Sequence, residues 1–151
     1  MKITCKPMDL NSVAEVAKIE ALCFSSPWPV DSFLNILNNN NALYLVALEN
    51  ENVAGYIGIF DLIDEFSIIN IATHPSYRNK GVAKYLMEQI HSRAKSKNCP
   101  LVTLEVRESN IAARSLYESF NYKEYGRLKN YYSDPLEDAI LYQLRIINQE
   151  I

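Results

Sequence analysis

The sequence is poor in the residues that build metal, redox and dinucleotide sites. Its three cysteines, Cys5, Cys23 and Cys99, form no C-x-x-C motif, and its two histidines, His74 and His91, have no metal-site spacing. Its four glycines form neither G-x-G-x-x-G nor G-x-x-x-x-G-K-[ST]. We therefore expect buried, reduced cysteines, as in cytosolic proteins, and no bound metal.

Long apolar runs and an excess of basic charge are also missing. No stretch of about 18 apolar residues and no signal peptide is present, so we expect a cytoplasmic protein that does not contact a membrane. Fifteen Lys and Arg against 18 Asp and Glu give a formal net charge of −3. This charge argues against direct nucleic-acid binding and is compatible with a basic substrate. The length predicts a single domain over residues 1–151, and we expect a monomer or a weak dimer.

Hydrophobic periodicity predicts an alternation of strands and helices along the whole chain. Strands are expected over residues 2–6, 43–49, 53–61, 65–73, 101–106, 122–128 and 139–146. Helices are expected from a capping box at Ser12 and Glu15, or from an earlier start at Asp9, to Cys23, around Phe33 to Leu37, and over residues 81–97 and 110–120. Residues 129–135 are expected to form a loop. This order predicts an α/β (α+β) fold with a mixed, twisted central sheet of about seven strands, flanked on both faces by about four helices.

The stretch I-I-N-I-A-T-H-P-S-Y-R-N-K-G-V-A-K, residues 68–84, leads from a strand into a helix. The first N–H groups of a helix lack partners and attract anions. Gly81 lets an anion approach the backbone, and Arg78 and Lys80 add positive charge. The stretch is therefore either an anion site or an ordinary strand-to-helix turn.

The segment R-N-K-G-V-A resembles the [RQ]-x-x-G-x-[GA] signature of the GNAT N-acetyltransferase superfamily, and the preceding N-I-A-T-H-P-S-Y supports it. The resemblance implies the GNAT fold and acetyl-coenzyme A as the acetyl donor. One departure is Ala83, where many members have a second glycine. By resemblance, the donor is held through the backbones of Ile71, Ala72 and Thr73 and of Arg78, Asn79, Lys80, Gly81, Val82, Ala83 and Lys84.

Three further residues are candidates for chemistry. Glu105 lies in an apolar strand and is either a general base or the ion-pair partner of Arg107. Asn110 and Tyr117 are seven residues apart, which places them on one helix face about 10 Å apart. Asn110 could contact a long cofactor or cap its helix, and Tyr117 could act on the cofactor or pack in the core.

The segments F-S-S-P-W-P, L-E-V-R-E-S-N-I-A-A-R-S-L-Y, R-L-K-N-Y-Y and E-D-A-I resemble the bacterial ribosomal-protein alanine N-acetyltransferases. These enzymes acetylate the N-terminal alanine of small-subunit ribosomal protein number eighteen. The resemblance implies that Glu105 is the proton acceptor, Tyr117 the proton donor and Asn110 a cofactor contact. It also implies that Trp28, Tyr131 and Tyr132 contact the N-terminus of the ribosomal protein.

Two other functions stay open from the sequence. One is an acetyltransferase for lysine or a small amine, and the other is a catalytically silent coenzyme A-binding module. Acidic residues also occur in the turns before two of the strands, at Asp61, Asp64, Glu65, Glu137 and Asp138. They form either solvated turns or an acidic rim that steers a basic substrate.

Overall fold

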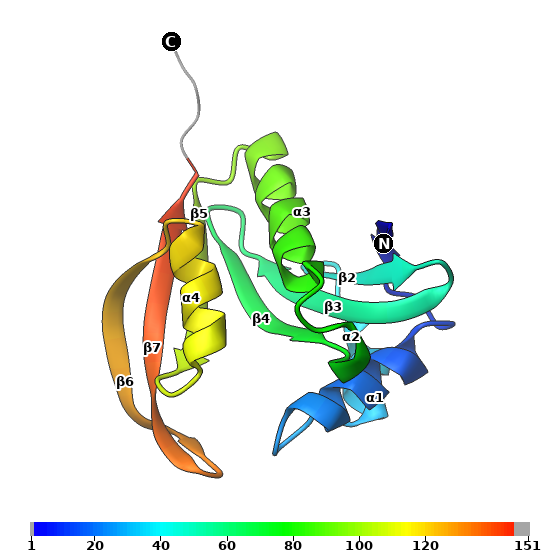
Figure 1. Cartoon of the computed structure of the whole chain (residues 1–151). Helices are drawn as coiled ribbons and strands as arrows, with labels where there is room; N and C mark the ends of the chain where they lie inside the picture. Colours follow the sequence, from blue (N-terminus) through cyan, green and yellow to red (C-terminus); the bar gives the residue numbers. More distant parts are fainter. Residues whose placement is uncertain (1, 147–151) are drawn as a thin grey trace.

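The computed structural model describes residues 2–146, and within them seven strands form one mixed sheet (Figure 1). The strands are β1 (Ile3–Pro7), β2 (Ala42–Glu49), β3 (Asn52–Asp61), β4 (Phe66–Thr73), β5 (Leu101–Arg107), β6 (Lys123–Ser133) and β7 (Leu136–Arg145). The helices are α1 (Val13–Cys23), α2 (Val30–Ile36), α3 (Val82–Ser96) and α4 (Ile111–Ser119), with a short 3₁₀ helix η1 (Pro75–Tyr77). The predicted fold class is confirmed. The predicted domain limits, residues 1 and 151, lie outside the described residues, so the domain assignment stays a prediction.

The strand order in the sheet is β1-β2-β3-β4-β5-β7-β6. The first four strands pair antiparallel in chain order, β4 and β5 run parallel, and β7 pairs antiparallel with both β5 and β6. The crossover from β4 to β5 passes through α3, as a parallel pair requires. The sheet therefore has two antiparallel parts that meet only at the β4–β5 pair.

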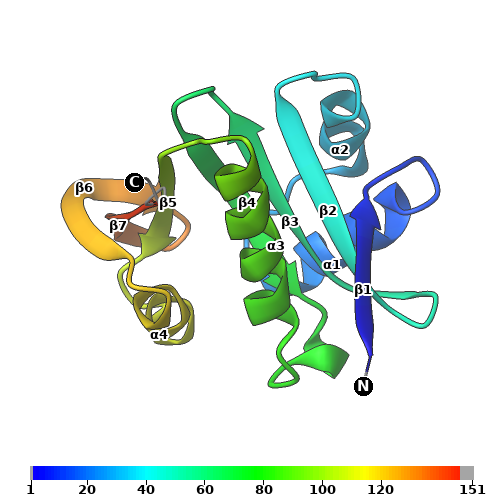
Figure 2. The ribbon, with the colours of Figure 1, turned by 90° about the horizontal axis from the view of Figure 1, so that it is seen from above.

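Helices cover both faces of the sheet, with α3 and α4 on one face and α1 and α2 on the other (Figure 2). Leu86 and Ile90 of α3 are fully buried against Ile57 and Ile59 of β3. On the opposite face, an aromatic cluster beneath α1 and α2 includes Phe33, Tyr44 and Tyr56. We call these the α3 face and the α1 face.

A β-bulge in β4 changes which residues point to each face. Ile59 pairs with Ile68 and Gly58 pairs with Asn70, so Ile69 is the extra residue. Before the bulge, Ile68 packs on the α3 face. By simple alternation residue 70 would point the same way, but the extra residue turns Asn70 to the α1 face.

Two local predictions are wrong. Ser12 does not cap α1 with its side chain. Its Oγ instead accepts a hydrogen bond from the backbone N–H of Asp9 at 3.0 Å, because Ser12 already has helical backbone angles. The predicted loop over residues 129–135 is mostly strand, since β6 extends to Ser133 through an irregularity between Leu128 and Tyr132.

Candidate active site

The parallel strands β4 and β5 diverge almost as soon as they meet. They pair only through Phe66 with Val102 and Ser67 with Thr103, and Figure 1 shows the strands separating beyond these pairs. Main-chain groups on the β5 side of β4, from residue 68 to 73, therefore have no strand partner. Such groups are available to bind a ligand between the two strands.

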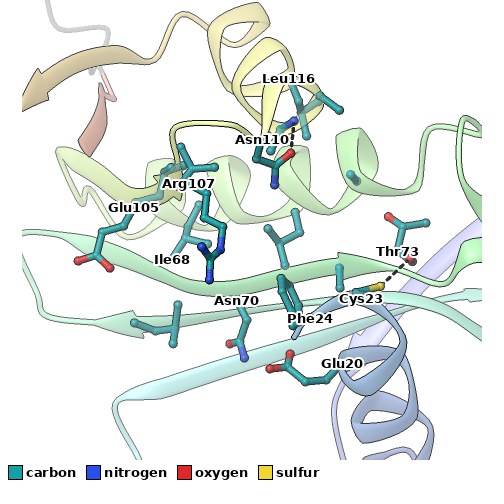
Figure 3. Close-up of a pocket in the computed structure, with 18 of the residues that line it drawn as sticks. Glu20, Cys23, Phe24, Ile68, Asn70, Thr73, Glu105, Arg107, Asn110 and Leu116 are labelled. Atoms are coloured by element: carbon teal, nitrogen blue, oxygen red, sulfur yellow. Dashed lines mark hydrogen bonds between the residues drawn. The ribbon is translucent and has the colours of Figure 1, made fainter. Parts of the chain in front are cut away.

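A cavity of about 810 Å³ occupies the space where the strands separate (Figure 3). We call it the main cavity. It is lined by β4, β5, α4 and the connection between α1 and α2. Most of the predicted site residues line it: Trp28, Ile71, Ala72, Thr73, Arg78, Ala83, Glu105, Asn110, Tyr117 and Tyr132.

The remaining predicted residues lie outside the main cavity. Tyr131 lines a neighbouring cavity of about 470 Å³, the second cavity, which shares Glu105 and Tyr132 with the first. Asn79, Lys80, Gly81, Val82 and Lys84 line neither cavity. They form the loop before α3 and its first turn, next to Arg78 and Ala83.

The loop before α3 leaves its backbone accessible. Gly81 has φ = 83°, a left-handed conformation that favours glycine, and a Cβ there would meet nothing within 4 Å. No side chain caps the first N–H groups of α3. Val82 is buried, so only its backbone can reach a ligand. These features fit the binding of an anionic group through main-chain N–H groups.

Tyr117 is buried in α4 and also lines the main cavity. Its ring packs between those of Tyr122 and Tyr142, with centroids 5.9 Å and 6.1 Å away. Burial raises the pKa of Tyr117 well above its ordinary value, so the hydroxyl keeps its proton at neutral pH. Tyr117 is thus both a core aromatic and a proton-bearing group in the cavity.

Asn110 caps α4. Its Oδ1 accepts a hydrogen bond from the N–H of Ala113 at 3.2 Å (Figure 3), which confirms the capping alternative. Its side chain also lines the main cavity. Contact between Asn110 and a cofactor stays a prediction.

Glu105 projects from β5 between the two cavities. The ion pair with Arg107, which was the alternative role for Glu105, does not form, because Arg107 binds Glu137 at 3.2 Å. No ion pair of residues 2–146 includes Glu105. Hydrogen bonding to the Glu105 carboxylate raises the pKa of Tyr131. An unpaired carboxylate beside tyrosine hydroxyls can accept a proton from a bound amine.

Arg107 was not predicted as a site residue, yet it fixes the hairpin beside Glu105. Its guanidinium donates to the carbonyls of Pro135 at 2.8 Å and Asp134 at 3.1 Å. It also lies 4.3 Å from the centre of the Tyr132 ring. Ser25 Oγ donates to the same Asp134 carbonyl at 2.6 Å. The β6–β7 turn is thereby joined to the α1–α2 connection beside the main cavity.

Glu20 is a second site residue that was not predicted from the sequence. It falls at the same helical spacing as the apolar residues of α1, so it was grouped with them. It is 4% exposed and lines the main cavity. It accepts hydrogen bonds from the Tyr56 hydroxyl and, at 3.0 Å, from the backbone N–H of Trp28. Trp28 then packs against Phe33, with ring centroids 5.3 Å apart. Glu20 therefore holds the Trp28 loop against the cavity.

Comparisons with known proteins agree with this geometry. The sequence matches the acetyltransferase (GNAT) family over residues 13–122. It is 39% identical over 141 residues to a Bacillus subtilis protein provisionally assigned as a ribosomal protein bS18-alanine N-acetyltransferase, and the match covers 93% of each chain. It is 30% identical over 147 residues to the Escherichia coli K12 bS18-alanine N-acetyltransferase, with 95% of this chain and 97% of that protein covered.

A solved structure is similar over nearly the whole chain. The crystal structure of the E. coli ribosomal-protein-S18-alanine N-acetyltransferase has a TM-score of 0.91 at 28% identity, covering 99% of this chain and 97% of that one. Sequence, fold and the placement of the cavity between β4 and β5 lead to the same conclusion: this chain belongs to the GNAT family of acetyltransferases.

Proposed function

We propose that this protein transfers the acetyl group of acetyl-coenzyme A to the N-terminal alanine of ribosomal protein bS18. The observation that carries the proposal is the main cavity, which brings Glu105 and the proton-bearing Tyr117 together beside the unpaired edge of β4. The relatives named as bS18-alanine N-acetyltransferases support the choice of acceptor.

The donor site combines two parts of the fold. GNAT acetyltransferases use acetyl-coenzyme A, which supplies an activated acetyl thioester. The backbone N–H groups from Arg78 to Lys84 would hold its pyrophosphate at the start of α3. Main-chain groups of Ile71, Ala72 and Thr73 would bind its arm and stabilise charge on the thioester oxygen. Asn110 would contact the arm from α4.

The protein contributes a proton acceptor and a proton donor. Glu105 takes a proton from the ammonium group of the acceptor, directly or through water, so that the neutral amine can attack. Tyr117 gives its proton to the departing thiolate. Its raised pKa keeps that proton in place until the thiolate forms.

An α-amine suits this chemistry better than a lysine side chain. An α-amino group has a pKa near 8, so neutralising it at pH 7 costs about 1.4 kcal/mol, whereas a lysine near 10.4 costs about 4.6 kcal/mol. A single carboxylate is an adequate base for neutralising an α-amine. Trp28 and Tyr132, which line the main cavity, and Tyr131, which lines the second cavity, would contact the peptide that carries the amine.

The test is a comparison of acceptors with the purified protein. A peptide with the N-terminal sequence of bS18 should be acetylated at its α-amine, as identified by fragmentation mass spectrometry. Matched peptides beginning with Ser or Met, an N-terminally blocked peptide containing lysine, and free lysine complete the series. Faster transfer to the blocked peptide or to lysine would contradict the proposal. No transfer to any acceptor, despite coenzyme A binding, would favour the silent binding module.

We also propose that the protein acts in the cytoplasm, where ribosomal proteins are made, as a monomer or weak dimer. Among residues 2–146 no helix is long and apolar enough to cross a membrane. Co-fractionation of the tagged protein with cytoplasmic markers, and its mass by light scattering, test the two parts separately.

A further inference from the structure

Behind the main cavity, one residue from each of three adjacent strands lies in register with the next. Tyr44 of β2 pairs with Gly58 of β3, and Gly58 pairs with Asn70 of β4. Because Gly58 has no side chain, the Tyr44 ring lies across it, where a Cβ would come within 2.0 Å of Cζ. The Tyr44 hydroxyl therefore reaches over β3 and donates to Asn70 Oδ1 at 2.5 Å.

This bond fixes the Asn70 amide and leaves its nitrogen without a partner. Asn70 is 9% exposed and lines the main cavity, and no residue from 2 to 146 accepts a hydrogen bond from its Nδ2. No completely enclosed side-chain nitrogen or oxygen in that range lacks a partner, so the unpartnered Nδ2 is open to the cavity. A largely buried amide donor without an acceptor is costly unless a ligand supplies one.

The bulge determines which ligand the amide can meet. It turns Asn70 to the α1 face, and Figure 3 shows Asn70 and Glu20 on one side of β4 with Asn110 and Leu116 on the other. The proposed donor contacts, α3 and Asn110, belong to the α3 face. The Asn70 amide therefore faces the acceptor rather than coenzyme A.

Acceptor chemistry then separates two classes of amine. An amide N–H pairs with a carbonyl oxygen. At a peptide N-terminus the carbon that bears the α-amine is bonded directly to the first backbone carbonyl. A lysine side chain or an alkyl amine has no carbonyl near its nitrogen.

We propose that Asn70, oriented by Tyr44, donates a hydrogen bond to the first backbone carbonyl of the acceptor and thereby selects a peptide α-amine over other amines. This inference rests on the proposed function and names a specificity residue for it. Asn70 touches the substrate, whereas Tyr44 acts through Asn70 and is a positioning residue.

The experiment compares two acceptors of matched shape, an Ala-initiated peptide and isopropylamine, which keeps the amine and methyl groups but lacks the carbonyl. Release of coenzyme A is followed for wild type, Asn70→Ala and Asn70→Asp; the ionised Asp keeps the shape but cannot donate. Both variants should raise KM for the peptide about tenfold and change kcat by less than about twofold, as expected for a lost ground-state hydrogen bond. Their kcat/KM for isopropylamine should stay within about twofold of wild type.

Two further variants separate orientation from stability. Tyr44→Phe keeps the ring but frees the amide, so it should raise KM for the peptide about threefold. Ser12→Ala removes a buried hydroxyl remote from the cavity and should leave KM unchanged. Acetyl-coenzyme A binding, measured by calorimetry, should be the same in all of these proteins.

The outcomes are distinct. Equal losses for the peptide and isopropylamine would overturn the inference and assign Asn70 to the thioester or to the fold. Unchanged KM for the peptide in Asn70→Ala would also overturn it, and this readout does not require turnover of isopropylamine. If the wild-type protein acetylates no peptide N-terminus, the proposed function is wrong. If it acetylates one, the variants test the role of Asn70 alone.

Discussion

Acidification should weaken the junction between α3 and the end of α4 through His91. His91 Nε2 and the Tyr122 hydroxyl are 2.7 Å apart, and the imidazole packs edge-on against Phe120 with ring centroids 4.9 Å apart. Burial lowers the pKa of His91 to about 4. This junction holds together the two helices that cover the α3 face, on which the donor is proposed to bind.

The sign and size of the effect follow from linkage. An unfolded histidine has a pKa near 6.5, so between about pH 6.5 and pH 4 the unfolded chain binds a proton that the folded protein does not. The stabilisation of the folded protein that comes from keeping His91 neutral is therefore fully present above pH 6.5 and is lost as the pH falls toward 4. A shift from 6.5 to about 4 corresponds to at most about 3.4 kcal/mol, at about 1.36 kcal/mol per unit. Because the ring is only half-buried, solvent screening reduces this to about 1–2 kcal/mol.

Urea unfolding at several pH values between 7 and 4.5 measures the loss. In His91→Gln the free energy of unfolding should fall less with decreasing pH than in wild type, and the difference should equal the amount assigned to the histidine. In Tyr122→Phe the decline should persist, because burial rather than the hydrogen bond lowers the pKa of His91. Parallel curves for wild type and His91→Gln, or an imidazole signal that titrates near pH 6.5 by NMR, would refute the reasoning.

Four substitutions test the site. Gly81→Val places a β-branched residue at φ = 83°, which costs about 1–2 kcal/mol, and should raise KM for acetyl-coenzyme A strongly; Gly126→Ala on the exposed strand β6 is the control. Glu105→Gln should lose most activity near pH 7 and recover part of it near pH 9, where an α-amine is already neutral; equal impairment at both pH values would indicate positioning instead. Tyr117→Phe should lower kcat by about 10²-fold with little change in acetyl-coenzyme A binding, and wild-type turnover would leave Tyr117 a core aromatic only. Gly58→Ala should lower the free energy of unfolding by about 1–3 kcal/mol and raise KM for the peptide, because its Cβ displaces the Tyr44 ring; an unchanged melting temperature would contradict this.

Features governed by local periodicity could be predicted from the sequence. The helical spacing of Leu86, Met87 and Ile90 matches one buried face of α3, and all three are fully buried. The predicted start and end of that helix, residues 81 and 97, are its two caps. Local sequence determined these features, so no information on distant contacts was needed.

Features that depend on distant partners could not be predicted. The five acidic turn residues were interpreted as either solvated turns or an acidic rim, but three of them, Asp61, Glu137 and Asp138, pair with Lys97, Arg107 and Arg127. Hydrogen bonds lower the pKa of all three carboxyl groups: chiefly that of Lys97 for Asp61, that of Ser109 for Glu137 and that of the Asn130 backbone for Asp138, with the paired arginines adding to the last two. Ion pairs between residues that are far apart in the sequence cannot be predicted from the sequence of a single turn.

The hairpin of β6 and β7 shows the same limit for backbone structure. Residues 129–135 contain Asn, Ser, Asp and Pro, which are typical of loops. The structure continues as strand because Tyr132 pairs with Glu137 and Ser133 with Leu136 across a tight turn. The turn is also held by Arg107 from β5, a contact that no local pattern indicates.

The bulge at Ile69 has a consequence for catalysis that ordinary alternation would not allow. In a regular strand residues 68 and 70 would point to the same face. With one extra residue, Ile68 and Ile71 face α3 while Asn70 and Ala72 face α1. The free edge of β4 lies between these two faces. Without the shift that the bulge introduces, Asn70 would share the α3 face with Ile68 and could not bond Tyr44, so the bulge places the proposed acceptor contact of β4 opposite the face on which the donor is proposed to bind.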